Sequence, residues 1–116
     1  MSEPSKWDEA THGPMSLESI RRLFQPESHY RVSWNTYPAG AAFNGWTSAG
    51  RLYIIGGGCT IRTGGHSWDL SAGEFLDVPA GDYFFSVIGE SAVELVSVWE
   101  LPELFWRSSK DTQSTV

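Results

Sequence analysis

The stretch 73–84 constrains the fold more than any other part of the sequence. Two short runs typical of β-strands, 74–78 and 82–87, flank the Pro-Ala-Gly corner of this stretch. Pro79 fixes its own φ angle and Gly81 can adopt a positive φ angle, so the chain can change direction here at little cost. The stretch therefore predicts two strands joined by a tight corner.

The same pattern of short β-prone runs between glycine-rich turns continues along most of the chain. The expected strands are 30–37, 41–46, 51–56, 58–63, 66–70, 74–78, 82–87 and 92–100. Between two of these runs, Gly64–Gly65 forms a strong signal for a two-residue hairpin. Many short strands with closely spaced turns predict an all-β protein, either an antiparallel sandwich or a barrel.

One short helix is expected before the strands. Ser16 is a suitable N-cap, and the Gln25–Pro26 pair ends the helical pattern. Between them, Leu17, Ile20, Leu23 and Phe24 form a single apolar stripe. A helix of this length is not stable alone in water, so we expect the stripe to cover part of the β-structure.

The 116 residues are enough for one domain with a single core. We expect a flexible N-terminal tail at 1–14, of which only Trp7 is a candidate to dock on the domain, a domain at 15–106 and a flexible C-terminal tail at 107–116. The formal charge of −6 disfavours binding to nucleic acid, which needs several cationic contacts. A single cysteine, Cys59, fits a reducing compartment, and no apolar run is long enough to span a membrane. We therefore expect a cytoplasmic protein with no nucleic-acid or membrane partner.

The segment from Tyr30 to Leu101 resembles a small single-domain cupin with an RmlC-like jelly roll. Stretch 73–84 has the glycine, Pro-x-Gly corner and spacing of the second cupin motif, and Pro38–Ala39–Gly40 with strand 51–57 resembles the first. This resemblance implies a cupin-type antiparallel β-barrel or jelly roll with a short N-terminal helix.

The resemblance does not extend to the metal ligands of the family. The two histidine positions of the first motif fall on Trp46 and Ser48, its glutamate position falls on Gly50, and the histidine of the second motif is replaced by Phe84. Segment 38–57 contains no His, Glu, Asp or Cys, the donors that transition metals need. We expect neither a metal nor another cofactor.

The altered ligand positions suggest a pocket with aromatic walls in the mouth of the barrel. The candidate ligand-binding residues are Trp34, Phe43, Asn44, Trp46, Ser48 and Phe84. Such a pocket would suit a small aromatic or apolar ligand. The alternative is that these side chains fill the barrel and leave no cavity.

Two other functions stay open on the sequence alone. The domain could be a metal-independent isomerase, cyclase or lyase that uses Glu94 or a histidine as its acid–base group, although a position of Glu94 in water at the rim is favoured. It could also be a structural or interaction partner through Leu104, Phe105 and Trp106. Whether it is an enzyme is left open. We further expect a homodimer built on strand 29–37 and this C-terminal apolar patch.

Overall fold

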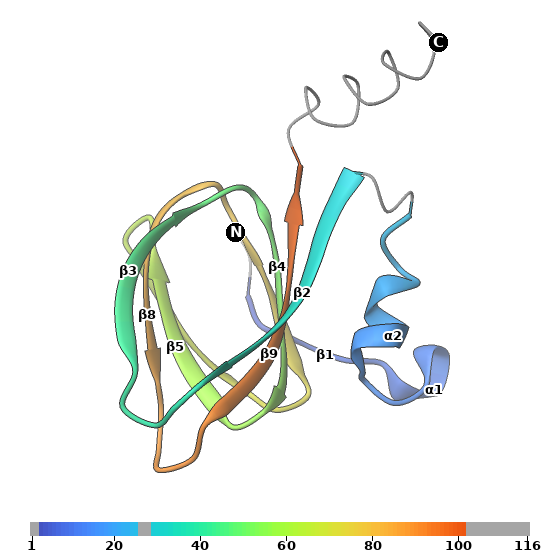
Figure 1. Cartoon of the computed structure of the whole chain (residues 1–116), viewed down its shortest axis with the longest axis horizontal. Coiled ribbons are helices and arrows are strands. Elements are labelled where there is room, and N and C mark those ends of the chain that lie inside the picture. The colour runs from blue at the N-terminus through green and yellow to red at the C-terminus, as the bar shows by residue number, and fades with distance from the viewer. Residues whose placement is uncertain (1–2, 26–28, 102–116) are drawn as a thin grey trace, which may run out of the picture.

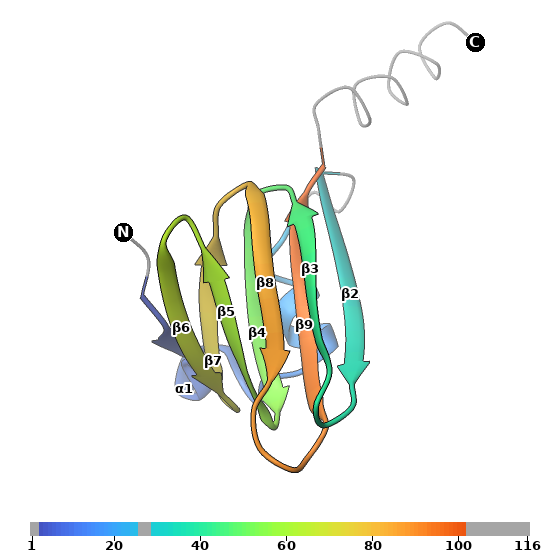
Figure 2. The ribbon, with the colours of Figure 1, turned by 90° about the vertical axis from the view of Figure 1, so that its left-hand side faces the viewer.

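The computed structural model describes residues 3–25 and 29–101, which form two antiparallel β-sheets packed face to face (Figures 1 and 2). The five-stranded sheet contains, in spatial order, β1 (Ser5–Lys6), β7 (Glu74–Val78), β4 (Gly50–Gly56), β9 (Val93–Glu100) and β2 (Tyr30–Tyr37). The four-stranded sheet contains β3 (Ala42–Thr47), β8 (Gly81–Val87), β5 (Gly58–Thr63) and β6 (His66–Ser71). In Figure 2 the four-stranded sheet lies in front, with β2 and β3 on the same side of the molecule.

The eight predicted strands are confirmed, and no end of these strands differs from its prediction by more than one residue. Gly64 and Gly65 join β5 to β6 with φ angles of 57° and 81°, as a hairpin turn with two left-handed residues requires. Gly81 has a φ angle of 138° at the start of β8. The Pro-Ala-Gly corner therefore carries the chain from β7 in one sheet to β8 in the other.

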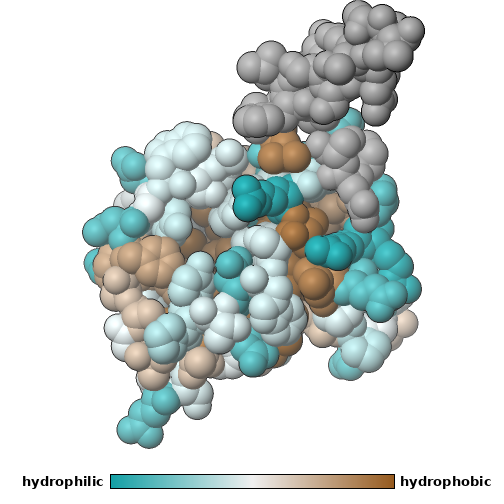
Figure 3. Space-filling view, viewed as in Figure 1, coloured by the Kyte–Doolittle hydropathy of each residue, from teal (hydrophilic) through white to brown (hydrophobic). Residues whose placement is uncertain are grey.

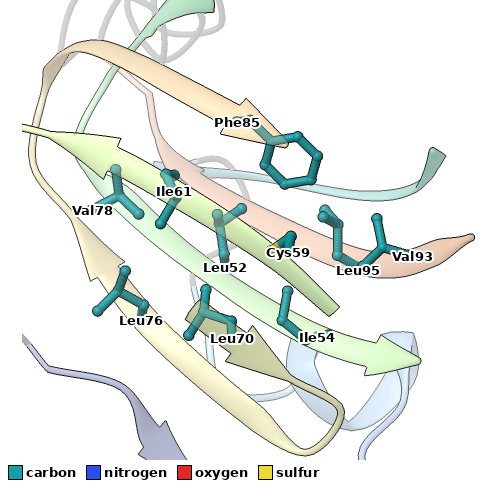
Figure 4. Packing of buried hydrophobic residues seen from close by; sticks show 10 residues of the cluster. All are labelled: Leu52, Ile54, Cys59, Ile61, Leu70, Leu76, Val78, Phe85, Val93 and Leu95. Carbon is teal, nitrogen blue, oxygen red and sulfur yellow. The ribbon is translucent and has the colours of Figure 1, made fainter. Parts of the chain in front are cut away.

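The main hydrophobic core lies between the two sheets. Its buried side chains come from both layers and point toward one another (Figure 4): Leu52, Ile54, Cys59, Ile61, Leu70, Leu76, Val78, Phe85, Val93 and Leu95. Because successive residues of a strand face opposite sides, these positions define which face of each strand from β4 to β9 is the barrel interior.

A second apolar cluster covers the outer face of the five-stranded sheet. Helices α1 (Glu9–His12) and α2 (Leu17–Arg21) lie on this face (Figure 1). Ser16 caps α2 as predicted, in a reciprocal capping box with Ser19. The Ile20 side chain is buried against Tyr53 and Val96 of the sheet, so the apolar stripe covers the β-structure as expected. Leu23 is the exception, since it remains exposed.

The N-terminal segment is bound to the domain, where the sequence had suggested a loose tail over 1–14. Strand β1 pairs with β7, and the indole nitrogen of Trp7 donates a hydrogen bond to the Gly13 carbonyl oxygen at 2.7 Å. The Trp7 ring also meets Tyr53 edge-on, with centroids 5.7 Å apart. These contacts explain why the segment stays on the sheet. The expected C-terminal tail at 107–116 and the patch Leu104–Phe105–Trp106 lie outside the described residues.

Across residues 3–25 and 29–101, neither helix has the length and apolar character needed to cross a lipid bilayer.

Candidate functional site

A cavity of about 310 Å³ lies between the two sheets. Most of its walls come from β2 and β9 on one side and from β3 and β8 on the other. The lining residues are Arg31, Ser33, Asn35, Tyr37, Phe43, Leu52, Ile61, Tyr83, Phe85, Leu95, Ser97 and Trp99. In the space-filling view, hydrophobic surface is recessed between the two sheets, behind paler residues (Figure 3). The barrel interior is thus filled near the core residues of Figure 4 and hollow beside β2 and β3.

Three polar side chains form a hydrogen-bonded group on the β2–β9 wall. The hydroxyl oxygens of Ser33 and Ser97 lie 3.1 Å apart, and the Asn35 amide nitrogen donates to the Ser97 hydroxyl at 3.0 Å and to the Ser33 hydroxyl at 3.5 Å. Ser97 is only 3% exposed. Buried hydroxyls without partners are costly, so this mutual bonding is what allows polar groups inside the barrel.

Three aromatic rings close one end of the cavity. Tyr37 lies with its ring centroid 5.2 Å from that of Phe43 and 5.2 Å from that of Phe85. Phe43 and Phe85 are stacked at 5.1 Å. These separations are typical of favourable aromatic pairs, so the rings form a rigid apolar wall.

Tyr83 on β8 forms part of the wall that faces the β2–β9 wall. Its pKa is raised above the usual value, chiefly because burial disfavours the phenolate and also because Tyr37 is close. The phenol therefore stays protonated at neutral pH and can donate a hydrogen bond.

Arg31 lies near the start of β2, at the end of this strand away from Tyr37, and is directly across from Trp99 of β9 in the strand register. Arg31 is exposed, so the guanidinium marks the rim of the cavity.

A larger groove of about 620 Å³ lies at one end of the barrel. Arg51 and Asp77 in its wall form an ion pair at 2.6 Å, so these two charges neutralise each other. The groove borders Phe24 and Glu100, next to Gln25 and Leu101, where two parts of the chain that the structure describes end. The residues that line the smaller cavity all belong to strands that the structure describes.

No family model matches the chain, and no curated protein matches it. Solved structures do. The Cupin 2 conserved barrel domain protein from Salinispora arenicola superposes with a TM-score of 0.61 at 13% identity, covering 75% of this chain and 76% of that one. The Cupin_2 domain of an XRE family transcriptional regulator from Enterobacter cloacae gives 0.59 at 13% identity over 89% and 97% of the two chains. This chain has the cupin fold.

The cupin domain of Cnp3 from Schizosaccharomyces pombe is a third similar structure. It has a TM-score of 0.58 at 21% identity, and the match covers 71% of this chain but 59% of that one. At such identities the likeness concerns the fold, and the chemistry of this domain has to be argued from its own side chains.

Of the six side chains expected in the pocket, the structure brings only Phe43 to the cavity. Trp34, Asn44, Trp46 and Phe84 occupy the alternate positions of their strands, which face away from the barrel. Trp34 is 42% exposed and Trp46 is 67% exposed. The expectation that these four side chains point inward is corrected for this reason.

The contacts of Phe84 and Ser48 lie outside the cavity. The Phe84 ring lies on the outer face of β8 beneath the Arg62 guanidinium, which is 4.6 Å from the ring centroid. Ser48 follows β3 in a loop, where its carbonyl oxygen accepts a hydrogen bond from the Thr47 hydroxyl at 3.0 Å, and it does not line the cavity.

The candidate acid–base residues lie away from the cavity. Glu94 is exposed and shares the outer face of β9 with Val96 and Val98. His66 is exposed at the start of β6, with its ring stacked 5.6 Å from Trp68. Burial, with a smaller effect of Asp69, raises the pKa of the Cys59 thiol to about 12. That thiol is a small core side chain and is not a nucleophile at neutral pH.

The cavity does not suit the metal ion that many cupins hold. None of its lining residues is His, Cys, Asp or Glu. Across the part of the chain that the structure describes, no three such side chains cluster. The donors present are hydroxyl, amide and guanidinium groups, which do not form a transition-metal site.

Proposed function

We propose that this cupin domain binds a small molecule with an aromatic or apolar body in the cavity between its sheets. The observation that carries the proposal is a cavity of about 310 Å³ with aromatic walls and a small polar group inside the barrel. Ligand pockets typically have volumes from about 300 to 1,000 Å³ and combine apolar walls with a few placed polar groups.

The partial exposure of the inward-facing rings supports the same proposal. Tyr37, Phe43, Tyr83 and Trp99 all line the cavity, yet none of them is buried. A bound ring would remove their apolar surface from water, at about 25 cal/mol for each Å². The alternative of a fully filled barrel would leave these faces covered by other side chains.

The acid–base alternative has less support. It depends on a titratable group beside the ligand, and Glu94 is exposed on the outer face. The only titratable lining groups are Arg31, Tyr37 and Tyr83. Ligand binding is therefore the function that the geometry supports best.

The test uses the uncharged probe 2-naphthamide, whose binding is followed by calorimetry and by changes in protein NMR signals. Ser33→Phe should fill the cavity and weaken binding at least about tenfold, because Ser33 lines the wall. Ser67→Phe is the matched control, because Ser67 is an exposed serine on the outer face of β6. Thermal midpoints would show whether both variants are folded. The proposal is wrong if the probe does not bind, or if it binds Ser33→Phe as well as the parent protein.

A further inference from the structure

We propose that the ligand of this cavity is a small aryl carboxylate, whose carboxylate is held by Arg31. The inference rests on the proposed function and specifies the chemical class of the ligand. It depends on the charge of the lining, on the hydrogen-bond donors of the β2–β9 wall and on the order of these groups along β2.

The lining carries one charge, and that charge is positive. Arg31 is the only lining residue that is ionised at neutral pH, and no carboxylate lines the cavity. This is unusual in a chain whose formal charge is −6. On the neighbouring strand, Glu94 and Glu100 occupy the outward-facing positions of β9 and so do not face the cavity.

The Arg31 guanidinium has no ionic partner within residues 3–25 and 29–101. Arg51 in the same sheet is bound to Asp77, and Arg62 lies over the Phe84 ring. A guanidinium binds a carboxylate through two parallel N–H···O bonds, which gives both affinity and orientation. One cation among aromatic walls favours a singly charged planar anion over a doubly charged phosphate group.

The polar group beside Arg31 has donor capacity left over. The Ser33 and Ser97 hydroxyls carry two protons, and the bond between them uses one. Asn35 supplies the donors for the other two bonds of the group. One hydroxyl proton is therefore available to a ligand oxygen. The protonated Tyr83 on the facing wall is a further donor.

The groups follow one another in a fixed order along β2. Arg31, Ser33, Asn35 and Tyr37 are alternate residues on its inward face, which spans roughly 20 Å at about 3.3 Å for each residue. The cation is at one end, the hydroxyl group is in the middle, and the Tyr37–Phe43–Phe85 rings are at the other end. A molecule with a carboxylate at one end and an aromatic body behind it matches this order, and Trp99, which is across from Arg31 and also lines the cavity, offers an aromatic wall to a ligand too short to reach the far rings.

The experiment compares 2-naphthoate with 2-naphthamide, which has the same shape without the charge. Calorimetry on the full chain should show the acid binding about five- to tenfold more tightly than the amide. Arg31→Gln should reduce this ratio to about one. Arg62→Gln, which removes a guanidinium from the outer face, should leave the ratio as it is in the parent protein. Raising the salt concentration should narrow the ratio, because the Arg31 side chain is exposed and its charge is screened.

The outcomes separate the two proposals. If both probes bind with equal affinity, or if Arg31→Gln keeps the preference for the acid, the cavity binds ligands and the carboxylate assignment is wrong. If neither probe binds, the proposed function fails and the assignment fails with it. Both proposals are supported if the parent protein and Arg62→Gln prefer the acid and Arg31→Gln does not.

Discussion

The Tyr83 ring lies directly against Gly45 of the neighbouring strand. The two residues are partners in the β3–β8 register, and a Cβ atom added to Gly45 would be 2.7 Å from the Tyr83 hydroxyl oxygen and 2.8 Å from two ring carbons. A side chain at position 45 would therefore displace the ring. Because Tyr83 lines the cavity, the absence of a side chain at position 45 sets the position of one cavity wall.

Gly45→Ala should accordingly weaken ligand binding and lower stability. The displaced ring has to move into the cavity or away from it, and such overpacking typically costs about 1–3 kcal/mol. Gly56→Ala is the matched control: Gly56 is also a strand glycine, and the nearest atom to its added Cβ would be the Glu94 carboxylate oxygen at 3.9 Å. Titration of 2-naphthamide and thermal unfolding of both variants give the comparison. If Gly45→Ala and Gly56→Ala bind 2-naphthamide equally well and unfold at the same temperature, the Tyr83 ring can move without a loss of stability or affinity.

The strands could be predicted from the sequence because their ends are marked by backbone chemistry. Glycines with positive φ angles, such as Gly64, Gly65 and Gly81, stand at turns where other residues are strained. The corner after β7 and the hairpin after β5 were recognised for this reason. Strand β1 and helix α1 were not predicted, because a two-residue strand and a four-residue helix have no periodic pattern to detect.

Gly81→Val should destabilise the domain more than Gly89→Val does. Both glycines have positive φ angles, but the 138° of Gly81 is much further from the left-handed region open to other residues than the 83° of Gly89. Neither added Cβ would meet another atom within 4 Å, so the difference would come from the backbone alone. Such strain costs about 1–3 kcal/mol. Equal midpoints of the two variants in urea unfolding would contradict this ranking of Gly81→Val and Gly89→Val.

The Cys59 thiol should make the stability of the domain fall at alkaline pH. Its pKa is about 12 in the folded chain, against a usual value of 9.0, because burial disfavours the thiolate. Below pH 9 the thiol is neutral in both states and its contribution to stability is complete. Between pH 9 and 12 only the unfolded chain ionises, so the contribution is lost at up to about 1.4 kcal/mol for each pH unit.

The measurement is the free energy of unfolding of the parent protein and of Cys59→Ala at pH 8 and pH 10.5. Cys59 is fully buried, so the substitution should be destabilising at pH 8. Its cost should be smaller at pH 10.5, where the unfolded parent gains the free energy of ionisation. If Cys59→Ala lowers the free energy of unfolding by the same amount at pH 8 and pH 10.5, the thiol of the folded protein titrates near its usual pKa.

The cavity residues could not be found from the sequence because β2 turns polar residues toward the barrel interior and apolar residues outward, which is the reverse of the usual arrangement. Tyr30 and Val32 are apolar, yet they face outward and pack under the N-terminal segment, while Ser33 and Asn35 face into the barrel. Alternation alone shows that a strand has two different faces, and it does not show which one is inside.

An error of one residue explains the other missed positions. Motif spacing pointed to Trp46 and Phe84, while the inward-facing positions of β3 and β8 include their neighbours Gly45 and Tyr83. A shift of a single residue moves every side chain of a strand to the opposite face. With aromatic residues at both 84 and 85 and at both 43 and 46, composition could not resolve the register.

The last prediction is a homodimer formed through the free edge of β2. In the five-stranded sheet β2 pairs with β9 alone, so its other edge has no partner strand within the described residues. Trp34 on this strand is 42% exposed, and Arg31 is the only charge that β2 carries against edge-to-edge pairing. Light scattering at micromolar concentration should therefore give a mass near twice the 12.9 kDa of one chain.

Two variants on the outer face of β2 test whether this edge forms the interface. Trp34→Asp and Thr36→Lys should shift the mass toward a single chain, because a charge at the edge opposes pairing with a second copy. Trp46→Asp is the control, since Trp46 is the more exposed tryptophan and lies on β3 in the other sheet. Far-UV spectra should be the same for all of them. A parent protein with the mass of one chain would exclude the dimer, and a dimer that only Trp46→Asp disrupts would place the interface on the four-stranded sheet.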